Sequence, residues 1–394
     1  KVMSVYAMRK AFTIHRAIFN VVDDRKTGGL KFRLGKNRSE KTVYIVDEAS
    51  MINNFSDRPG GRGLLGSLID YVFEEHLSGN KLIVIGDTAQ LPPVHQELSP
   101  ALNERVLKTD FDLKVTAHRL TEVVRQQQES GILMNATSLR EQIARKEVEI
   151  GIATKGYKDI YRMMGNRLED GLRYAYDKFG TENTSLICRS NKMATQYNKF
   201  IRQTLLFRED EIEAGDFLMI VKNNYHWLPL DSKAGFLANG EYVEVMRVNN
   251  LEEMYGHRFA NLTLRLIDYP DHAHFEATVF LETLHSFTPA MPFEEYKAMQ
   301  EEAMLQYAED SSTREEQLAM MRADPYLNAL QVKYAYALTC HKSQGGQWNI
   351  VFVDMGFLPD GKVDVEFMRW LYTAMTRASE ELFLVNFRPQ FFKG

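Results

Sequence analysis

The sequence predicts an α/β protein with parallel sheets and a small inserted β-barrel, and three observations lead to this prediction. The run Thr42–Val46 is mostly β-branched or aromatic, which is typical of a short buried strand. Asp47 and Glu48 follow it directly, and in open α/β sheets ligands bind at such carboxyl ends of strands. Between residues 217 and 281, short strand-like runs separated by turn residues indicate a barrel.

The length and composition set the class of protein. A chain of 394 residues can form two or three domains, and 44% hydrophobic with 26% charged residues is ordinary for a soluble globular protein. No apolar run approaches the ~18 residues of a membrane span, so no contact with a membrane is expected. Cys188 and Cys340 have neither metal-ligand spacing nor a disulfide framework, so a reducing, cytoplasmic location is expected.

The net charge of −5 argues against a surface that is basic all over. The acidic residues are unevenly distributed, because residues 293–324 are strongly acidic with few basic side chains. This stretch is expected to form an exposed helix or helix pair. The rest of the chain is then near neutral, so any nucleic-acid binding depends on local contacts.

The N-terminal part is expected to begin with a helical turn and a hairpin. Thr13 is suited to cap a helix that starts at Ile14. Residues 21–34 have the pattern of two strands around a turn at 27–29. Basic side chains in this hairpin and just after it can contact the phosphates of a nucleic acid. For each of them, a place in a basic loop without function is an equal alternative. They are Lys26, Lys31, Arg33, Lys36, Arg38 and Lys41.

The later elements are predicted from apolar runs bounded by turn residues. Helices are expected, in chain order, at residues 64–77, 132–146, 157–179, 193–207 and 370–378. Strands outside the barrel are expected at residues 81–85, 113–120, 185–188, 334–338, 350–354 and 382–385. Strands that alternate with helices in this way indicate parallel sheets.

Five motifs in a fixed order link these strand ends to a known family. They are the runs 42–51 (TVYIVDEASM), 85–94 (IGDTAQLPPV), 120–126 (LTEVVRQ), 336–347 (YALTCHKSQGGQ) and 372–378 (YTAMTRA). In this order they resemble motifs II, III, IV, V and VI of superfamily 1 helicases, closest to the RecD-like and Dda-like 5′→3′ DNA helicases. The resemblance extends from about Ala11 to Val385.

The resemblance implies two RecA-like lobes built on parallel sheets, with a small SH3-like barrel and a β-hairpin as insertions. Residues 1–119 would form lobe 1A, with the hairpin, called 1B, at about residues 20–40. Residues 120–214 and 330–394 would form lobe 2A, and residues 215–329 the inserted 2B domain with its acidic helical extension. A monomer is expected.

The same resemblance implies a site for ATP and Mg²⁺ between the lobes. Asp47 would hold Mg²⁺, and Glu48 would activate the attacking water. Glu48, Gln90, Arg125 and Arg377 would act in catalysis; for Arg125 a structural salt bridge is the alternative. The expected nucleotide-binding residues are Asp47, Glu48, Gln90, Arg125, Gln344, Gly345 and Arg377.

Nucleic acid is expected to lie against polar residues of both lobes, again from the resemblance. These residues are Thr13, His15, Asn191, Lys192, Thr339, His341, Lys342 and Ser343. Their hydroxyl, imidazole, amide and ammonium donors suit phosphate contacts, which position a strand without reading its sequence. For Thr13, helix capping is the alternative role.

One motif of such a hydrolase is not recognisable in the sequence. The phosphate loop, Gly-x-x-x-x-Gly-Lys followed by Ser or Thr, has no match, and in the family it would precede Ala11. Only ten residues come before Ala11. We expect the loop to lie in residues missing from this chain. A helicase fold that binds DNA without hydrolysis, or a loop supplied by another chain, is the alternative.

The expected activity is that of an ATP-dependent DNA helicase that moves 5′→3′ along single strands, with the hairpin splitting the duplex. Single-stranded and forked DNA are the expected partners, together with recombination or replication proteins. A catalytically silent DNA-binding module that regulates a partner is the alternative from another class. An RNA helicase of the same superfamily is a third possibility, because phosphate contacts do not identify the sugar.

Overall fold

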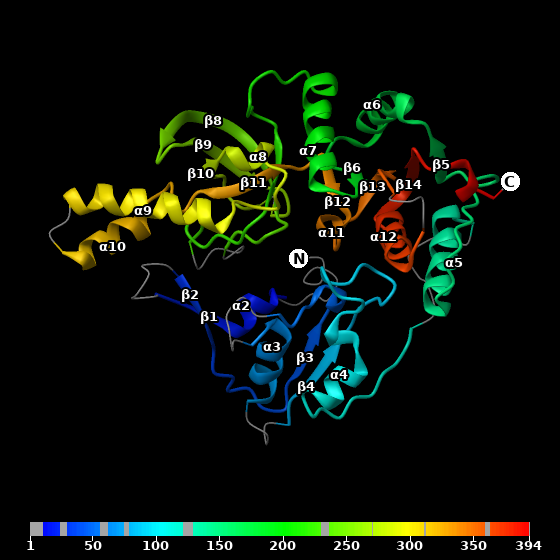
Figure 1. Ribbon diagram of the computed structural model, residues 1–394, viewed down its shortest axis with the longest axis horizontal. Coiled ribbons are helices and arrows are strands. Elements are labelled where there is room, and N and C mark those ends of the chain that lie inside the picture. The colour runs from blue at the N-terminus through cyan, green and yellow to red at the C-terminus, as the bar shows by residue number, and fades with distance from the viewer. Residues whose placement is uncertain are drawn as a thin grey trace. The chain divides into compact units, whose positions relative to one another are not determined.

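A computed structural model describes residues 11–23, 30–55, 62–74, 79–120, 129–229, 236–269, 271–310, 313–358 and 363–393. The chain divides into two compact units (Figure 1). Unit 1 comprises residues 1–24, 30–152 and 362–376, and unit 2 comprises residues 25–29, 153–361 and 377–394. Within the described residues, no helix combines the length and the apolar character that a membrane span requires.

Unit 1 consists of a parallel strand pair, a hairpin and several helices. Its elements are α2 (Ile14–Ile18), β1 (Phe19–Asp23), β2 (Leu30–Leu34), β3 (Val43–Val46), η1 (Ala49–Met51), α3 (Leu64–Phe73), β4 (Lys81–Val84), η2 (Pro100–Leu102), α4 (Glu104–Thr109), α5 (Gly131–Arg145) and α12 (Val365–Met375). Helix α3 forms because its apolar residues recur at helical spacing, which buries Leu65, Leu68, Ile69 and Val72 on one face.

The parallel pair β3–β4 positions the acidic residues of unit 1. Val46 lies opposite Val84, and Tyr44 and Val46 pack into the core with α3. The expectation that this strand is buried is correct for one face only, because Val43 and Ile45 are 51% and 54% exposed. Alternation along a strand sends successive side chains to opposite faces, and here only the face toward α3 is packed.

The expected hairpin is confirmed. Strands β1 and β2 pair antiparallel, from Phe19 opposite Leu34 to Asp23 opposite Leu30. The turn at residues 27–29, with Lys26, and the side chain of Lys31 lie outside the described residues. The other basic residues predicted here, Arg33, Lys36, Arg38 and Lys41, are exposed.

Two predicted elements of unit 1 are wrong in type or length. Residues 113–120 form no strand, because a strand needs a hydrogen-bonded neighbour and no described strand pairs with them. Helix α3 ends at Phe73, earlier than the predicted Leu77. Helix α5, in contrast, matches its prediction within one residue: the Ser130 hydroxyl caps it by accepting from Leu133 N, and Lys146 ends it in the left-handed conformation.

Unit 2 contains a five-stranded parallel sheet with the strand order β12-β6-β13-β14-β5. Its strands are β5 (Ile160–Met163), β6 (Thr184–Cys188), β12 (Ala337–Thr339), β13 (Trp348–Asp354) and β14 (Ala378–Val385). Its helices are α6 (Leu168–Phe179), α7 (Asn191–Phe200), which continues into a π-helical turn η4 (Ile201–Leu205), and α11 (Cys340–Ser343). The expected helix at 157–179 is wrong at its start, because β5 and a 3₁₀ turn precede α6.

The predicted barrel is confirmed as a closed barrel with the strand order β10-β11-β7-β8-β9. Its strands are β7 (Phe217–Ile220), β8 (Tyr242–Met254), β9 (His257–Leu266), β10 (Phe275–Phe280) and β11 (Leu330–Tyr334). The single strand predicted at 334–338 is wrong, because residue 334 ends β11 in the barrel and residues 337–338 belong to β12 in the sheet. The short helix α8 (Glu282–His285) follows β10.

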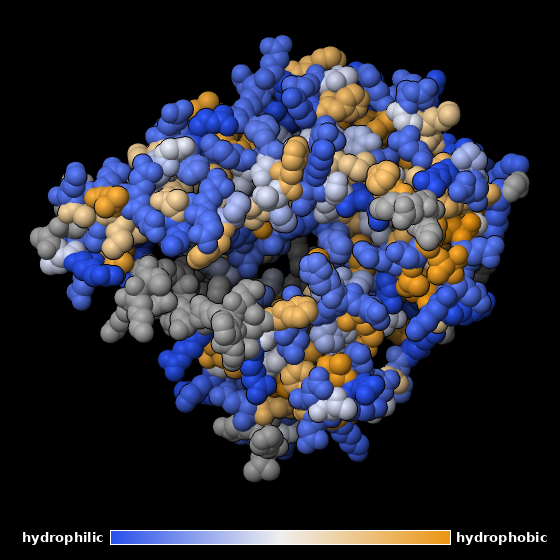
Figure 2. All heavy atoms as spheres, viewed as in Figure 1, coloured by the Kyte–Doolittle hydropathy of each residue, from blue (hydrophilic) through white to orange (hydrophobic). Residues whose placement is uncertain are grey.

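The acidic stretch forms the expected helix pair, α9 (Phe293–Asp310) and α10 (Arg314–Ala323). The two helices lie side by side and project from the barrel (Figure 1). Met299 and Ala303 of α9 pack on Phe259 and Phe280 of the barrel. Figure 2 shows mostly hydrophilic residues over the pair, with hydrophobic ones between them. The helices are thus anchored by one apolar face.

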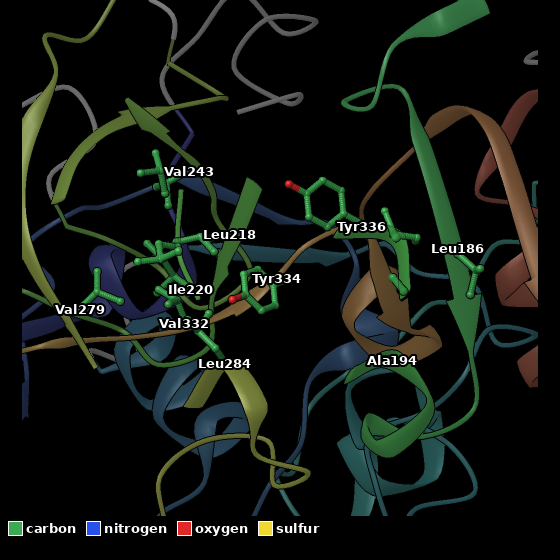
Figure 3. Close-up of a cluster of buried hydrophobic side chains, with 14 of the residues drawn as sticks. Leu186, Ala194, Leu218, Ile220, Val243, Val279, Leu284, Val332, Tyr334 and Tyr336 are labelled. Atoms are coloured by element: carbon green, nitrogen blue, oxygen red, sulfur yellow. The ribbon is translucent and has the colours of Figure 1, made fainter. Parts of the chain in front are cut away.

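One hydrophobic core joins the barrel to the sheet of unit 2. Figure 3 shows Tyr334 and Tyr336 between the barrel residue Leu218 and the sheet residue Leu186. Cys188 lies in the same core; it and Cys340 are both free, buried thiols, and burial raises the pKa of each to about 12. Barrel and sheet therefore form one compact body.

The compact units do not coincide with the expected lobes. Helices α5 and α12 were expected in lobe 2A, and both group with unit 1. The physical reason is that α12 packs on α5 and hydrogen-bonds the loop that follows β4, as described below.

Candidate functional site

Two loops with acidic residues begin at the same edge of the β3–β4 sheet in unit 1. Because β3 and β4 are parallel and in register, Asp47–Glu48 and Gly86–Asp87 both follow the carboxyl ends of strands. Ile85 N donates to Val46 O at 2.8 Å, and Ala49 N donates to Ile85 O at 2.9 Å. These two hydrogen bonds hold the beginnings of the loops together.

Glu48 occupies an unusual backbone conformation. Its φ and ψ are 53° and 36°, in the left-handed region that non-glycine residues seldom adopt. Asp47 Oδ1 accepts from Glu48 N at 2.9 Å, which supports this turn. The Asp47 side chain is exposed and that of Glu48 is half-buried. The two carboxylates therefore stand at the strand end in different environments.

Gly86 allows the two loops to approach closely. A Cβ atom at this position would lie 2.9 Å from Ser50 N and 2.9 Å from Leu102 Cδ1. The first of these neighbours is backbone and cannot move aside cheaply. A glycine is therefore required for the loop after β4 to lie against the loop after β3.

Asp87 is held by side chains from two helices of unit 1. Tyr372 of α12 donates its hydroxyl to Asp87 Oδ2 at 2.5 Å, and Arg140 of α5 lies 3.9 Å from Oδ1. Oδ1 also accepts from Ala89 N at 2.9 Å. The carboxylate is thus engaged in positioning its own loop.

Helix α12 also fixes the segment that carries Gln90. Leu91 N donates to Thr373 Oγ1 at 2.9 Å. Arg369 Nη1 donates to Gln90 O at 3.3 Å and also to Thr88 O. The run that resembles motif VI therefore holds the run that resembles motif III through direct contacts within unit 1.

The loops of unit 1 contain buried polar atoms without a partner in the part of the chain that the structure describes, as well as the exposed carboxylate of Asp47. Gln90 Oε1 and Ser50 Oγ are buried and have no hydrogen-bond partner among the described residues. Within those residues, no group of three or more His, Cys, Asp or Glu side chains could hold a metal alone. Asp47 fits Mg²⁺, because Mg²⁺ keeps several waters and takes one or two carboxylates together with substrate phosphates.

The segment at the start of unit 1 has a clear structural role. Thr13 caps α2, with its Oγ1 accepting from Arg16 N at 3.3 Å, as the capping alternative predicted. The hydroxyl hydrogen remains available to donate to a phosphate oxygen. His15 is half-buried, and burial lowers its pKa because it disfavours the charged imidazolium.

In unit 2 the polar runs also gather at one sheet edge. β12 pairs with β6 in parallel, with Thr339 opposite Cys188. Asn191 and Lys192 begin α7 directly after β6, where Ser190 Oγ accepts from Met193 N at 3.2 Å. The residues expected after β6 and after β12 are thus brought together by strand pairing.

The loop after β12 begins the short helix α11. His341 is exposed, and Lys342 Nζ donates to Asn239 Oδ1 at 2.6 Å. Burial lowers the pKa of Lys342. Ser343 is fully buried and donates its hydroxyl to Cys340 O at 2.8 Å. In this structure Ser343 supports the loop from inside the protein.

Arg377 is bonded to the glycine turn that ends this loop. Its Nη1 donates to Gly346 O at 3.2 Å, and Trp348 N donates to Arg377 O at 3.0 Å. Gly345 has a φ of 77°, which favours glycine. Arg377 is only 8% exposed. In the chain it stands between α12 and β14, and not in the helix as predicted, because α12 ends at Met375 and not at residue 378. Gln344, at the end of α11, is half-buried.

Arg125 cannot be placed in this way. Residues 121–128, which include most of the run that resembles motif IV, lie outside the described residues. The expected role of Arg125 stays a prediction.

Lys333 was not identified from the sequence as a site residue. It lines a cavity of about 20 Å³, room for about one water, together with Asn191, Thr339 and Lys342. Its Nζ donates to the carbonyl oxygens of Thr283 and Ser286, at 3.0 and 2.5 Å. Burial, aided by the charge of Lys342, lowers the pKa of Lys333 to about 8. Only burial distinguishes it, and a lysine in a strand gives no such signal in sequence.

One segment in the C-terminal part of the chain matches a known protein family. Residues 334–385 match the model of the UvrD-like helicase C-terminal domain. This segment is similar to the C-terminal domain of UvrD-like helicases. It includes β12, α11, the glycine turn, α12 and Arg377. The helicase resemblance drawn from the motifs is thereby confirmed.

The chain is also similar to individual proteins over most of its length. It is 21% identical over 420 residues to an uncharacterised protein, R530, of Acanthamoeba polyphaga mimivirus, covering 95% of this chain and 81% of that protein. A Pif1 helicase from Bacteroides, solved with ADP-AlF3 and single-stranded DNA, is 15% identical, covers 89% and 72% of the two chains, and has a TM-score of 0.44. A structure of two coordinating Pif1 helicases at forked double-stranded DNA is 14% identical, covers 89% and 71%, and has a TM-score of 0.44.

Proposed function

We propose that this protein is an ATP-dependent DNA helicase of superfamily 1. The observation that carries the proposal is the match of residues 334–385 to the UvrD-like helicase C-terminal domain, because it covers both the loop after β12 and Arg377. The ordered motifs in the rest of the chain support the same activity. ATP hydrolysis would drive movement along a single strand and separation of the duplex.

The nucleotide chemistry is assigned first to unit 1. Bound Mg²⁺ supplies positive charge that neutralises the phosphate oxygens. Asp47 is the exposed carboxylate suited to hold it, and the half-buried Glu48 is suited to take a proton from the attacking water. Gln90 would accept a hydrogen bond from that water with its side-chain oxygen, or donate to a γ-phosphate oxygen with its amide nitrogen. Arg125 and Arg377 would supply positive charge to the γ-phosphate, in accordance with the motifs.

The DNA contact is assigned to the carboxyl edge of the sheet in unit 2. The donors lie at the ends of two neighbouring parallel strands: Thr339 ends β12, and the others follow β6 or β12, namely Asn191, Lys192, His341 and Lys342. Such donors bind phosphates of any sequence, as a protein that moves along a strand requires. Thr13 and His15 would add contacts from unit 1.

The finer assignments follow from the motif resemblance. We assign the protein to the RecD-like branch, with 5′→3′ movement, single-stranded and forked DNA as substrates, and a monomer as the acting form. Recombination or replication proteins would be its partners in a reducing, cytoplasmic location. The exposed basic residues after β1–β2 would contact DNA near the fork.

Unwinding of forked DNA tests the proposal. The full-length protein should separate a duplex with a 5′ single-stranded tail when ATP and Mg²⁺ are present, and a duplex with only a 3′ tail should remain paired. Glu48→Gln, which keeps the size of the side chain, should abolish unwinding and retain DNA binding. DNA binding without unwinding by the wild-type protein would support the silent DNA-binding module in place of the helicase.

A further inference from the structure

The outer face of the barrel carries a cavity that the motor does not use. Its volume is about 670 Å³, within the range of small-molecule sites. Strands β8, β9 and β10 form its floor, and Trp227 and the Pro325–Tyr326 segment line its sides. None of these residues belongs to a helicase motif.

The floor of this barrel cavity is a row of neutral polar side chains. Asn250 lies opposite Asn261, which lies opposite Thr278, so the three form one line across neighbouring strands. Thr278 donates its hydroxyl to Asn261 Oδ1 at 2.7 Å, and Asn250 Nδ2 donates to Glu252. These bonds fix the orientation of both amide groups.

The fixed amides leave the Asn261 nitrogen as a donor group and the Asn250 oxygen as an acceptor for a ligand. Asn261 Nδ2 and Asn250 Oδ1 make no hydrogen bond in the described part of the chain. A donor beside an acceptor is complementary to the edge of a nucleobase, as when a single asparagine contacts both N6 and N7 of adenine. Asn261 is half-buried, so its amide gains from a partner that returns a hydrogen bond lost on burial, while the exposed Asn250 is accessible to a ligand.

The aromatic residues of the cavity are held in place by their polar atoms. Trp227 Nε1 donates to Asn328 O at 2.8 Å, and Tyr326 OH donates to Glu252 Oε2 at 2.5 Å. Each ring is therefore fixed at its edge, and both rings line the cavity, although Tyr326 also packs on Phe259. Stacking of bases on such rings tolerates any sequence.

The charges of the cavity favour a neutral ligand. Arg247 is the one cation among its described lining residues, and Glu252 and Glu276 are its anions. Arg247 lies 4.0 Å from Glu276 at an exposed position and donates to Asn249 Oδ1 at 2.6 Å. A groove that tracks phosphates would have an excess of cations. This one has an excess of anions.

We propose that the barrel cavity binds an unpaired nucleobase, stacked on Trp227 and hydrogen-bonded by Asn250 and Asn261. The proposal rests on the proposed function in one respect: unwinding supplies unpaired bases. A base held on the barrel would retain a separated strand through its bases, which differs from the phosphate contacts assigned to the sheet edge. Binding here should therefore depend little on salt.

Nucleoside binding by the full-length protein tests the proposal without use of the motor. Saturation-transfer NMR with adenosine and thymidine should show binding, and deoxyribose alone should show none. Asn261→Asp keeps the oxygen that accepts from Thr278 but replaces the free donor with an acceptor, so it should weaken binding about tenfold or more. Asn249→Asp adds the same charge to the cavity lining and should bind within about twofold of wild type.

A second pair of variants isolates stacking from folding. Trp227→Phe and Trp227→Leu both remove the bond to Asn328 O, but only the first keeps an aromatic face. Nucleoside binding should survive in the first and weaken about tenfold in the second, at equal melting temperatures.

Equal binding by the two members of either variant pair would overturn the proposal. So would binding of an extended peptide with no binding of nucleosides, which would make the cavity a peptide groove. Nucleoside binding by a protein that fails to unwind DNA would refute the proposed function and leave this site intact.

Discussion

Replacement of Asp216 by asparagine should strongly destabilise the junction between the barrel and the sheet of unit 2. Asp216 is fully buried and accepts from Arg202 Nε and Nη2 at 2.9 and 2.8 Å. Tyr336 OH donates to it at 3.0 Å and Glu213 N at 2.8 Å. Arg208 Nε lies 3.5 Å away. One carboxylate thus connects the segment after α7 to the first barrel strand and to β12.

The magnitude follows from burial on both sides of the pair. Arg202 is itself buried, so Asp216→Asn leaves a guanidinium charge with its main counter-charge removed. Loss of one partner of a buried ion pair costs about 3–5 kcal/mol. The free energy of unfolding in urea should fall by that amount with an unchanged m-value. Asp170→Asn, in an exposed pair with Arg167, should cost less than about 1 kcal/mol.

A double variant tests the mechanism of this loss. Asp216→Asn combined with Arg202→Met removes both charges, so it should regain part of the stability lost by the single variant. A loss below about 1 kcal/mol in Asp216→Asn would refute the reasoning. A double variant less stable than the single one would show that the unpaired charge is not the cause.

Three further predictions concern the loops and the small cavity. Gly86→Ala places a Cβ 2.9 Å from Ser50 N and should lower the free energy of unfolding by about 1–3 kcal/mol; unchanged thermal unfolding would contradict this close approach. Tyr372→Phe removes the donor to Asp87 and should cost about 1–2 kcal/mol and slow ATP hydrolysis by the full-length protein; wild-type rates would show that this bond does not position the loop. Folding lowers the pKa of Lys333 from 10.5 to about 8, so the unfolded chain binds the proton more tightly. The free energy of unfolding of wild type, relative to that of Lys333→Met, should therefore rise by up to ~3 kcal/mol between pH 8 and 10.5. A difference that stays constant with pH in urea titrations would be evidence against this burial.

Local pattern was sufficient to predict most elements of the fold. Strands such as β6 and β13 are short apolar runs bounded by turns, and α5 carries a serine cap and a helical period. Four of the barrel strands could be predicted for the same reason. The fifth, β11, pairs with β10 across the whole acidic extension, and no local pattern shows a pairing of that range.

The same distinction applies to the candidate site. Residues at the ends of strands, such as Asp47 after β3 and Thr339 at the end of β12, could be placed because parallel strands bring their carboxyl ends to one edge. The bond between Tyr372 and Asp87 joins positions 285 residues apart and could not be predicted. It also explains why α12 groups with unit 1, although a chain-order division places it with the strand that follows.

Burial of polar side chains was the least predictable property. Ser343 stands within a run of polar donors predicted to face a ligand, yet its hydroxyl is turned into the protein toward Cys340 O. Lys333 occupies a strand in which a lysine would ordinarily face solvent, and tertiary packing buries it. Both outcomes depend on neighbours that arrive from distant parts of the chain.

ATP hydrolysis by the full-length protein, measured with and without single-stranded DNA, tests the central claim most directly. Wild type should hydrolyse ATP, and single-stranded DNA should accelerate it strongly. Glu48→Gln should abolish hydrolysis while DNA binding remains, because the variant keeps the loop at the end of β3 and loses only the base. Absence of hydrolysis by wild type, with DNA binding intact, would contradict the helicase and leave a DNA-binding fold without a motor.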